Sequence, residues 1–554
     1  MRHLRTLRGL RGGWQLVEAC AAPDRCQRSV LREILCLNRD TEFARDHGLG
    51  PATTLDQYRR RVPVRRYDEL RPWMDRTVRG VPRVLVAEPV RTVAATSGST
   101  AAPKHVPITR AYLRALRAVE DLWLEATLHE VPAAAAGDIL VLASPRFVGP
   151  LAPGVACGTI TGLALPLGGA EGHLLVPPEP IERLPSSPLR RYAILLLALR
   201  ADLTMLAAPA PSALVRFLEE LRAWTPWLLD DLGRGSFVPP PGLCVEQAPD
   251  PRLGAAPQPE RARQLGAGGE LSAPRAWPKL ALAATWLDGS CALYAQRLRA
   301  LLPGVGLHKI GYAATEGYFS LACTATDPGS VLALGHYLFE LIPEHGSDSD
   351  VFALENVEVG RRYRIVVTTP AGLYRYDIED VVEVVGRAGR APLVAFSHRC
   401  GVASVAEEKL TEAQLLAAVK RVSVSHALVI ADLIAAPQLP EQGPGSYRLE
   451  LELGRAADVG AATLARAFDA VLCEINVDYR FSRDAGRLGP PELTLVSRSE
   501  LEQKRRALMP HAADDERRKP WHLVLDAWDA PRSATAIPAA APGDRPARPR
   551  GEGA

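Results

Sequence analysis

The sequence predicts an α/β fold with a large N-terminal domain and a smaller C-terminal α+β domain. Its 554 residues exceed the size of a single ordinary core, so we expect two domains. Short apolar runs alternate with helical patterns up to about residue 398, and a compact strand–strand–helix–strand pattern follows. We therefore expect a large domain over residues 1–398 and a small domain over residues 399–530. Residues 531–554, rich in Pro, Ala, Arg and Gly, should be disordered.

The composition is that of a globular protein that can bury a large interior, with 47% hydrophobic and 23% charged residues. Because 66 basic residues nearly balance 63 acidic ones, there is no electrostatic case for nucleic acid, and small-molecule partners become the default. Nine cysteines without a CxxC pair indicate reduced thiols and a cytoplasmic protein. The sequence has no secretory signal pattern and no apolar run of about 18 residues, so we expect no membrane span.

Apolar spacing predicts the elements that frame the candidate site. Helices are expected over residues 14–48, after Thr109, over 211–224 and 290–302, and around Leu464, Phe468, Leu472 and Ile475. Strands are expected over residues 138–143, 277–284, 307–312, 363–368, 381–385, 426–433, 447–453 and 492–496. Residues 149–172 could line a ligand cleft or form a loop. Residues 233–276, rich in Pro, Gly and Ala, are expected to be an irregular surface excursion.

The first candidate site is residues 96–109, TSGSTAAPKHVPIT, a hydroxyl-rich turn that leads into a strand-like run. Backbone N–H groups of a tight turn can converge on an anion, and hydroxyls and a nearby lysine add donors and charge. The stretch matches neither GxxxxGK[ST] nor GxGxxG, and an ordinary loop remains the alternative. The candidate phosphate ligands are Ser97, Gly98, Ser99, Thr100 and Lys104.

Two further polar clusters follow strand-like runs. Tyr312, Thr315 and Glu316 belong to GYAATEGYF, which comes after an apolar run, and ligands gather at the carboxyl ends of strands in open α/β sheets. Residues 372–380, GLYRYDIED, lie between two strand-like runs. They could form a hairpin with solvated charges, or one carboxylate could accept hydrogen bonds from ribose hydroxyls.

In this order, the three clusters resemble the nucleotide-binding motifs of the auxin-responsive, Gretchen-Hagen-type acyl-acid amido synthetases, a branch of the adenylate-forming enzymes. The likeness also takes in DTEFARDHGL, WPKLALAATWLDGSCALY, VEVGRRYRIVVTT and EEKLTE. It spans residues 28–525 apart from 233–276. Each motif alone is weakly specific, whereas the ordered set is strongly so.

The resemblance implies a ligase that attacks ATP with a carboxylic acid, releases pyrophosphate, and transfers the acyl group from the acyl-adenylate to an amino acid or amine, releasing AMP. ATP and Mg²⁺ would be the cofactors. In this scheme Asp380 holds the ribose, Tyr312 flanks the adenine, Thr315 touches the α-phosphate and Glu316 approaches the metal. The resemblance also places Ser97, Gly98, Ser99, Thr100, Lys104, Tyr376 and Arg399 in the nucleotide site and makes Lys519 catalytic together with Thr315. The small domain would swing on a hinge at residues 399–401.

The sequence departs from the family pattern at a few positions. Ala101 stands where the phosphate turn usually has glycine, Asp377 where arginine is usual, and Glu379 and Glu407 where glycine is usual. Alanine resists the φ > 0 conformations that glycine permits, and added acids oppose a polyanion. A catalytically degenerate relative that binds a ligand or partner is therefore the alternative function. A CoA ligase fits less well, because the motifs resemble the amide-forming branch.

Overall fold

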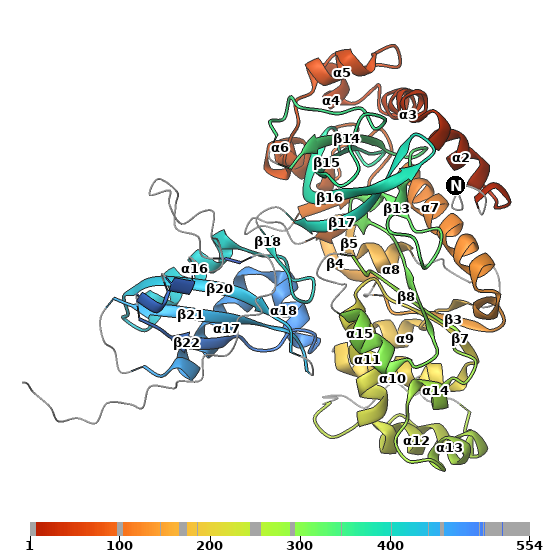
Figure 1. The fold of residues 1–554 in the computed structure, drawn as a ribbon, viewed down its shortest axis with the longest axis vertical. Coiled ribbons are helices and arrows are strands. Elements are labelled where there is room, and N and C mark those ends of the chain that lie inside the picture. Colours follow the sequence, from red (N-terminus) through yellow and green to blue (C-terminus); the bar gives the residue numbers. More distant parts are fainter. Residues whose placement is uncertain are drawn as a thin grey trace, which may run out of the picture.

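The computed structural model describes most of the chain. The described residues are 7–96, 104–143, 146–164, 174–184, 187–243, 256–288, 294–344, 346–399, 402–440, 443–454, 459–497, 499–501, 503–504 and 523–524. Their sheets and helices form three main hydrophobic cores. Figure 1 shows β20–β22 with α16–α18 set to one side of a larger, elongated body.

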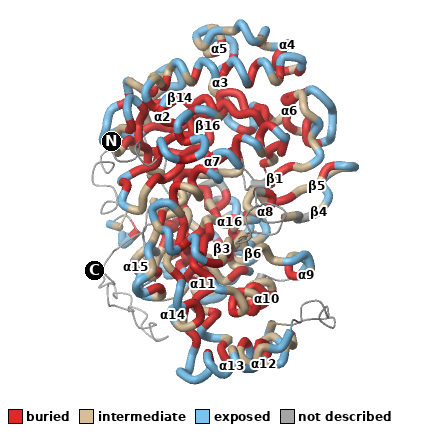
Figure 2. The backbone as a smooth tube through the Cα atoms, turned by 90° about the vertical axis from the view of Figure 1, so that its right-hand side faces the viewer, coloured by how far each residue is buried: buried red, intermediate tan, exposed pale blue. Residues whose placement is uncertain are grey.

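The largest sheet carries the third sequence motif and packs under the N-terminal helices. Its strand order is β12-β13-β17-β16-β15-β14, with β18 pairing β17 and β19, and all its pairs are antiparallel. Its strands are β12 (Ser320–Leu321), β13 (Ser330–Leu332), β14 (Leu338–Pro343), β15 (Arg362–Thr368), β16 (Tyr376–Ala388), β17 (Ala391–Arg399), β18 (Val402–Ala403) and β19 (Leu410–Thr411). Figure 2 shows buried backbone concentrated around β14 and β16.

The N-terminal helices cover one end of this sheet. They are α2 (Gly13–Ala21), α3 (Pro23–Leu37), α4 (Glu42–Asp46), α5 (Leu55–Arg61) and α6 (Tyr67–Val78). Pro23 begins α3, where its missing N–H costs nothing. The buried side chain of Gln27 donates to the carbonyl oxygens of Leu334 and Tyr337, each at 2.9 Å, and accepts from Phe339 N at 2.6 Å. This polar contact fixes α3 against the start of β14.

A four-stranded sheet, ordered β2-β1-β5-β4, frames the first sequence motif. It consists of β1 (Thr92–Thr96), β2 (Lys104–Pro107), β4 (Phe147–Ala152) and β5 (Val155–Gly158), and helix α8 (Ile160–Ala164) follows it. Strands β1 and β2 are antiparallel, with Thr96 opposite Lys104. The predicted helix after Thr109 is α7 (Arg110–Glu130), and Thr109 Oγ1 caps it by accepting from Tyr112 N at 3.0 Å.

A parallel five-stranded sheet, β6-β3-β7-β8-β9, forms the other half of the large body. Its strands are β3 (Asp138–Val141), β6 (Leu174–Leu175), β7 (Leu203–Ala207), β8 (Leu282–Thr285) and β9 (Gly306–Lys309). The helical elements of this region are η1 (Pro132–Ala135), α9 (Glu179–Glu182), α10 (Ser187–Arg200), α11 (Pro211–Ala223), α12 (Thr225–Arg234), α13 (Pro259–Gly266), α14 (Ala273–Ala276) and α15 (Tyr294–Leu301). The hairpin of β10 (Ala313–Ala314) and β11 (Gly317–Tyr318) follows β9 and leads into the largest sheet.

The C-terminal unit has its own core. Its elements are α16 (Glu412–Ser425), β20 (Ile430–Gln438), β21 (Ser446–Leu453), α17 (Ala461–Ile475), α18 (Val477–Asp484) and β22 (Glu492–Leu495). Strands β20 and β21 are antiparallel, and β22 adds to β21 in parallel. Leu464, Phe468 and Leu472 of α17 are fully buried, which is the apolar face that the sequence predicts.

Several element expectations need correction. Helices α13 and α14 lie in the stretch expected to be irregular, and buried Leu265 and Leu271 join the second core. Pro259 and Pro274 stand in the first turns of these helices, where proline is compatible with a helix. Residues 426–433 were expected as a strand, but α16 runs to Ser425 and β20 begins only at Ile430.

In the part of the chain that the structure describes, no helix is long and apolar enough to cross a membrane.

Candidate active site

The second and third sequence motifs meet at the start of β16. Tyr312, just before β10, donates its hydroxyl to Asp380 Oδ2 at 2.7 Å. Tyr376, the first residue of β16, donates its hydroxyl to Glu316 Oε1 at 3.3 Å. Both carboxylates are buried. Two tyrosine–carboxylate hydrogen bonds therefore join the second and third motifs: Tyr312 donates to Asp380, and Tyr376 donates to Glu316.

The lysine of the first motif reaches the same place. Lys104 Nζ lies 3.5 Å from the Tyr376 hydroxyl and 3.5 Å from Glu379 Oε2, and it sits 5.8 Å from the centre of the Tyr67 ring. Lys104 is only 1% exposed. A buried ammonium needs anionic or aromatic neighbours to offset its lost hydration, and these contacts supply both kinds. The lysine of the first motif thus contacts two residues of the third motif, and one of them, Tyr376, is hydrogen-bonded to Glu316 of the second.

The structure constrains the turn that carries Thr315 and Glu316. The Tyr112 hydroxyl of α7 donates to the carbonyl oxygen of Thr315 at 2.7 Å. A Cβ added at Gly317 would lie 2.8 Å from the Phe319 ring and 2.9 Å from the Tyr337 ring. The turn therefore packs too closely for any other residue at position 317 without a shift of those rings. Thr315 itself is half-buried.

Tyr312 lies among other rings. Its centroid is 5.6 Å from that of Phe319 and 5.9 Å from that of Phe396, with which it stacks at 19°. Its burial and its hydrogen bond to Asp380 fix the orientation of that carboxylate. The role of Tyr312 beside an adenine stays a prediction.

Other predicted site residues are only partly placed. The backbone of Arg399 lies opposite Asp380 in the β16–β17 pairing, whereas its side chain is outside the described part of the chain. Ser97, Gly98, Ser99, Thr100, Ala101 and Lys519 also lie outside the described residues. Their predicted roles stay predictions.

A bulge in β16 presents Glu379 and Asp380. Val366 of β15 pairs with Asp377 and Arg364 pairs with Val381, so residues 378–380 lie opposite the single residue Ile365. Glu379 adopts φ +67°, a left-handed conformation that glycine adopts readily and other residues do not. Its N–H donates to Asp377 Oδ1 at 2.8 Å, which closes the turn. The bulge takes Glu379 and Asp380 out of register with β15, while Asp380 still pairs with Arg399 of β17.

The acid at position 377 is neutralised locally. Arg364 on the neighbouring strand donates to Asp377 Oδ2 and, at 2.7 Å, to Asp348 Oδ1. Burial raises the pKa of Asp377 above its usual range, and the Glu379 N–H and the Arg364 charge oppose that rise. The Asp377 carboxylate is therefore paired with an arginine of the neighbouring strand. Its negative charge does not count in full against a polyanion at the site.

A buried ion-pair group anchors the segment before the bulge. Arg375, at φ +47°, donates from Nε to Glu340 Oε2 at 2.8 Å, and Arg59 donates to Glu340 Oε1 at 2.8 Å. The Arg375 guanidinium also donates to the carbonyl oxygens of Arg59 and Val62. Glu340 is buried in β14. Residues of α5 and β14 are thus tied to Arg375, the residue that precedes β16.

These supporting residues lie outside the three polar clusters of the sequence, apart from Arg375. Glu340 and Arg364 stand as single charges within otherwise apolar strand runs, FELIP and YRIVV. A lone charge in a buried strand needs a partner. The sequence therefore indicates which strand positions form ion pairs, but not which residues they pair with. Tyr67 and Arg66, which reach Lys104 and Glu379, carry no such signal.

In the C-terminal unit, the EEKL motif forms a tight turn. Glu407 has φ +71° and Lys409 has φ +51°. Between them, the fully buried Glu408 accepts from Val405 N and Ala406 N, each at 2.6 Å, and from the Tyr447 hydroxyl. Glu407 forms an ion pair with Arg487 at 3.0 Å.

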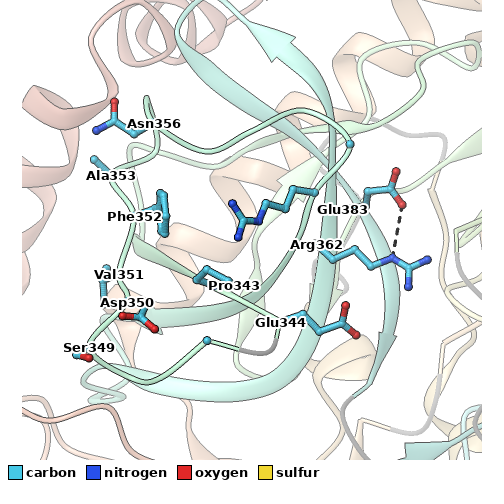
Figure 3. A pocket seen from close by; sticks show the side chains of 13 residues that line it. Pro343, Glu344, Ser349, Asp350, Val351, Phe352, Ala353, Asn356, Arg362 and Glu383 are labelled. Carbon is cyan, nitrogen blue, oxygen red and sulfur yellow. Dashed lines mark ion pairs between the residues drawn. The ribbon is translucent and has the colours of Figure 1, made fainter. Parts of the chain in front are cut away.

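A separate hollow of about 1060 Å³ lies at the other end of β14 and β15 (Figure 3). It is lined by Pro343, Glu344, Gly346, Ser349, Asp350, Val351, Phe352, Ala353, Asn356, Gly360, Arg361, Arg362 and Glu383. None of the predicted site residues lines it. It mixes exposed acids and bases, such as the Arg362–Glu383 pair at 3.8 Å. We place the candidate active site at the bulge.

Comparison with known proteins defines the class of this chain. The GH3 family N-terminal domain matches residues 14–307, the central domain residues 330–399 and the C-terminal domain residues 413–526. The chain belongs to the GH3 family, as the ordered motifs predict.

Named relatives cover most of the chain. The indole-3-acetic acid-amido synthetase GH3.8 of Oryza sativa subsp. indica is 28% identical over 87% of this chain and 85% of its own length. The indole-3-acetic acid-amido synthetase GH3.3 of Arabidopsis thaliana is 25% identical over 87% of this chain and 86% of its own. The GH3.15 acyl acid amido synthetase in complex with 2,4-DB shares the fold, with a TM-score of 0.64, 22% identity, and coverage of 92% of this chain and 93% of that one.

Proposed function

We propose that this protein is an ATP-dependent acyl-acid amido synthetase that adenylates a carboxylic acid and transfers the acyl group to an amino acid or amine. The observation that carries the proposal is the convergence of Lys104, Glu316 and Asp380, one residue from each motif, around Tyr376 and Tyr312. A cation beside two separately oriented carboxylates suits a nucleotide, whose phosphates need positive charge and whose ribose needs an acceptor.

Each of these residues then has a task. Asp380, held by the Tyr312 hydroxyl, accepts hydrogen bonds from the ribose hydroxyls. Lys104 faces the phosphates and offsets charge as the acid attacks the α-phosphate. The turn at Thr315, fixed from α7, touches the α-phosphate. The hydroxyl-rich residues of the first motif, Ser97, Ser99 and Thr100, add donors to the phosphate cradle.

Magnesium fits the donor set around Glu316. A Mg²⁺ ion that binds together with a nucleotide uses one or two protein carboxylates, phosphate oxygens and water. Glu316 is buried at the turn. Within the described part of the chain, its Oε1 accepts a hydrogen bond from Tyr376 and its Oε2 accepts none. The described residues hold no cluster of three or more metal-ligating side chains. We therefore do not propose a metal site made by protein side chains alone. The ion would neutralise phosphate charge as pyrophosphate leaves.

The departure from the family pattern at Asp377 does not favour the degenerate alternative. Asp377 is paired with Arg364. Lys519 would act from the small domain during adenylation and then withdraw as that domain turns. A reduced, cytoplasmic setting agrees with the free thiols of Cys20, Cys26, Cys36, Cys323 and Cys473.

The direct experiment is acid-dependent exchange of labelled pyrophosphate into ATP, run with a panel of aryl and indole acids. Exchange with at least one acid, followed by AMP and amide formation when amino acids are added, is the expected result. The absence of exchange with every acid, in protein that is folded and binds ATP, would favour the degenerate alternative. Exchange that yields a thioester with CoA and no amide would indicate a CoA ligase instead.

Two variants assign the roles. Glu316→Gln keeps the shape but loses the charge that a hard cation prefers, so exchange should require more magnesium. An unchanged magnesium dependence would remove Glu316 from the metal. Lys519→Ala should abolish exchange and leave amide formation from presynthesised acyl-adenylate nearly intact. Equal loss in both steps would point to misfolding or poor docking, and no loss would make Lys519 a surface charge.

A further inference from the structure

Glu379 places a carboxylate beside Lys104, the lysine of the proposed phosphate site. The family pattern has glycine at this position and therefore no side chain there. Its Oε2 is 3.5 Å from Lys104 Nζ, and its Oε1 is 3.6 Å from Arg66 Nε. The side chain of Glu379 is 14% exposed and that of Lys104 is 2% exposed. The lysine is therefore buried, and the carboxylate that contacts it is slightly exposed to solvent.

The backbone at Glu379 is held in this position despite its cost. Residue 379 has φ +67°, and the Asp377 carboxylate fixes its N–H at 2.8 Å. Asp377 is in turn held by Arg364. A left-handed glutamate is disfavoured relative to glycine. The surrounding ion pairs thus support a carboxylate at a turn where glycine would place no side chain beside Lys104.

Two anions cannot use Lys104 at once without repelling each other. A nucleotide phosphate that approaches Lys104 meets the Glu379 carboxylate, and like charges brought together oppose binding. The carboxylate also satisfies the buried ammonium when no phosphate is present. Glu379 thus stabilises the ligand-free site and weakens the ligand-bound one.

We propose that Glu379 is an affinity-determining residue, an internal counter-ion that competes with the nucleotide phosphates for Lys104. The inference rests on the proposed function, because it takes a polyphosphate as the ligand. Its consequence is a protein that binds ATP less tightly than the same site would with glycine at position 379. Removal of the carboxylate should strengthen binding of phosphate-bearing ligands and leave ligands without phosphate unaffected.

The test is calorimetric binding of ATP and of adenosine to the full chain and to Glu379→Gln and Glu379→Gly. Both variants should bind ATP about 5- to 20-fold more tightly, the usual scale of one coupling between charged groups. Adenosine affinity should stay within about twofold of the parent, since no phosphate is present. Glu383→Gln is the matched control. It removes a carboxylate from the same strand, paired only loosely with Arg362, and should leave both affinities unchanged.

The outcomes separate this inference from the function on which it rests. If the parent binds ATP and the Glu379 variants bind it equally or more weakly, the counter-ion role is wrong and the proposed function stands. A parallel gain in adenosine affinity would mean that Glu379 acts on the shape of the site, which also overturns the role. If neither the parent nor any variant binds ATP, the proposed function fails, and the inference fails with it. Glycine fits the φ at 379, so Glu379→Gly keeps the test open even if the glutamine variant folds poorly.

Discussion

The bulge at residues 376–380 and the turn at residues 405–411 solve the same backbone problem in different surroundings. Each holds a glutamate, Glu379 or Glu407, in the left-handed conformation at a position where the family usually has glycine. In each, a neighbouring carboxylate accepts backbone N–H groups: Asp377 accepts from Glu379, and Glu408 accepts from Val405 and Ala406. A well-placed carboxylate can therefore maintain a turn that has lost its glycine.

The two segments differ in what surrounds the carboxylates. Around the bulge, Arg364, Arg66 and Lys104 from three other segments offset the charges, and Lys104 belongs to the proposed ligand site. In the turn, Glu407 is paired with Arg487, whereas Glu408 forms no ion pair within the described part of the chain. Changes in the bulge should therefore alter ligand binding and stability together, and changes in the turn should alter stability of the small domain.

The largest effect is expected at the anchor of the bulge. Glu340→Gln removes the carboxylate shared by Arg59 and Arg375 and leaves buried guanidinium charge uncompensated. The free energy of unfolding should fall by about 3–5 kcal/mol. Denaturant unfolding measures the change, with Glu358→Gln as a control, because Glu358 pairs with Arg361 at the surface. A loss no larger than that of the control would mean that the bulge does not depend on this anchor.

The turn should respond more weakly to loss of its carboxylate. Glu408→Gln keeps one acceptor oxygen and turns an amide group toward Val405 N or Ala406 N, so a buried N–H loses its partner. We expect a loss of about 1–3 kcal/mol, confined to the unfolding of the small domain, with ATP affinity unchanged. A weakened ATP affinity would show that the turn belongs to the ligand site as well, which would break the comparison.

The same carboxyl makes a prediction about pH. Burial raises the pKa of Glu408 above its usual range, with the hydrogen bonds from Tyr447 and the backbone opposing the rise. A folded-state pKa above the unfolded value of about 4.3 contributes stability below that value, and the contribution is lost as the pH rises through the folded pKa. The small domain should therefore lose stability as the pH rises above about 4.3, and Glu408→Gln should flatten that dependence. An identical pH profile for parent and variant would contradict the assignment.

The smallest effects concern the strained glutamates themselves. Glu379→Gly and Glu407→Gly each relieve a left-handed conformation, against the greater backbone freedom of glycine in the unfolded chain. Glu407→Gly should raise the free energy of unfolding by about 0.5–1 kcal/mol. Glu379→Gly should raise it less, because it also leaves the buried Lys104 ammonium without its carboxylate. Only Glu379→Gly should also change ATP affinity. Thermal unfolding of the two variants gives the first quantity. A clear loss of stability in both would show that their ion pairs outweigh the strain.

The parts of the site that are local in sequence could be predicted from it. The hydroxyl-rich turn, the YAATE turn and the GLYRYDIED hairpin each carry their chemistry within a few residues, and their order identified the family. The cap at Thr109 and the apolar face of α17 follow from short-range spacing in the same way.

The remaining features depend on contacts between distant residues. Arg364 with Asp377, and Glu340 with Arg59 and Arg375, join separate strands and helices, and no spacing rule names such pairs. The positive φ of Glu379 opposes the usual preference of glutamate for negative φ. Only the resemblance to relatives with glycine at this position indicated such a conformation. Helices α13 and α14 do not follow from composition, because a Pro-, Gly- and Ala-rich stretch favours loop, whereas Pro259 and Pro274 stand in the first turns of these helices.

The most direct test of the account is ATP binding to Asp380→Ala, compared with the parent by calorimetry. Glu383→Gln serves as the control, since it removes a carboxylate from the same strand outside the proposed site. If Asp380 holds the ribose, Asp380→Ala should bind ATP about 10- to 100-fold more weakly, with little loss in the control and a similar melting temperature for all three proteins. Equal ATP affinity in Asp380→Ala and the parent would place the nucleotide elsewhere and contradict the assignment of the active site to the bulge.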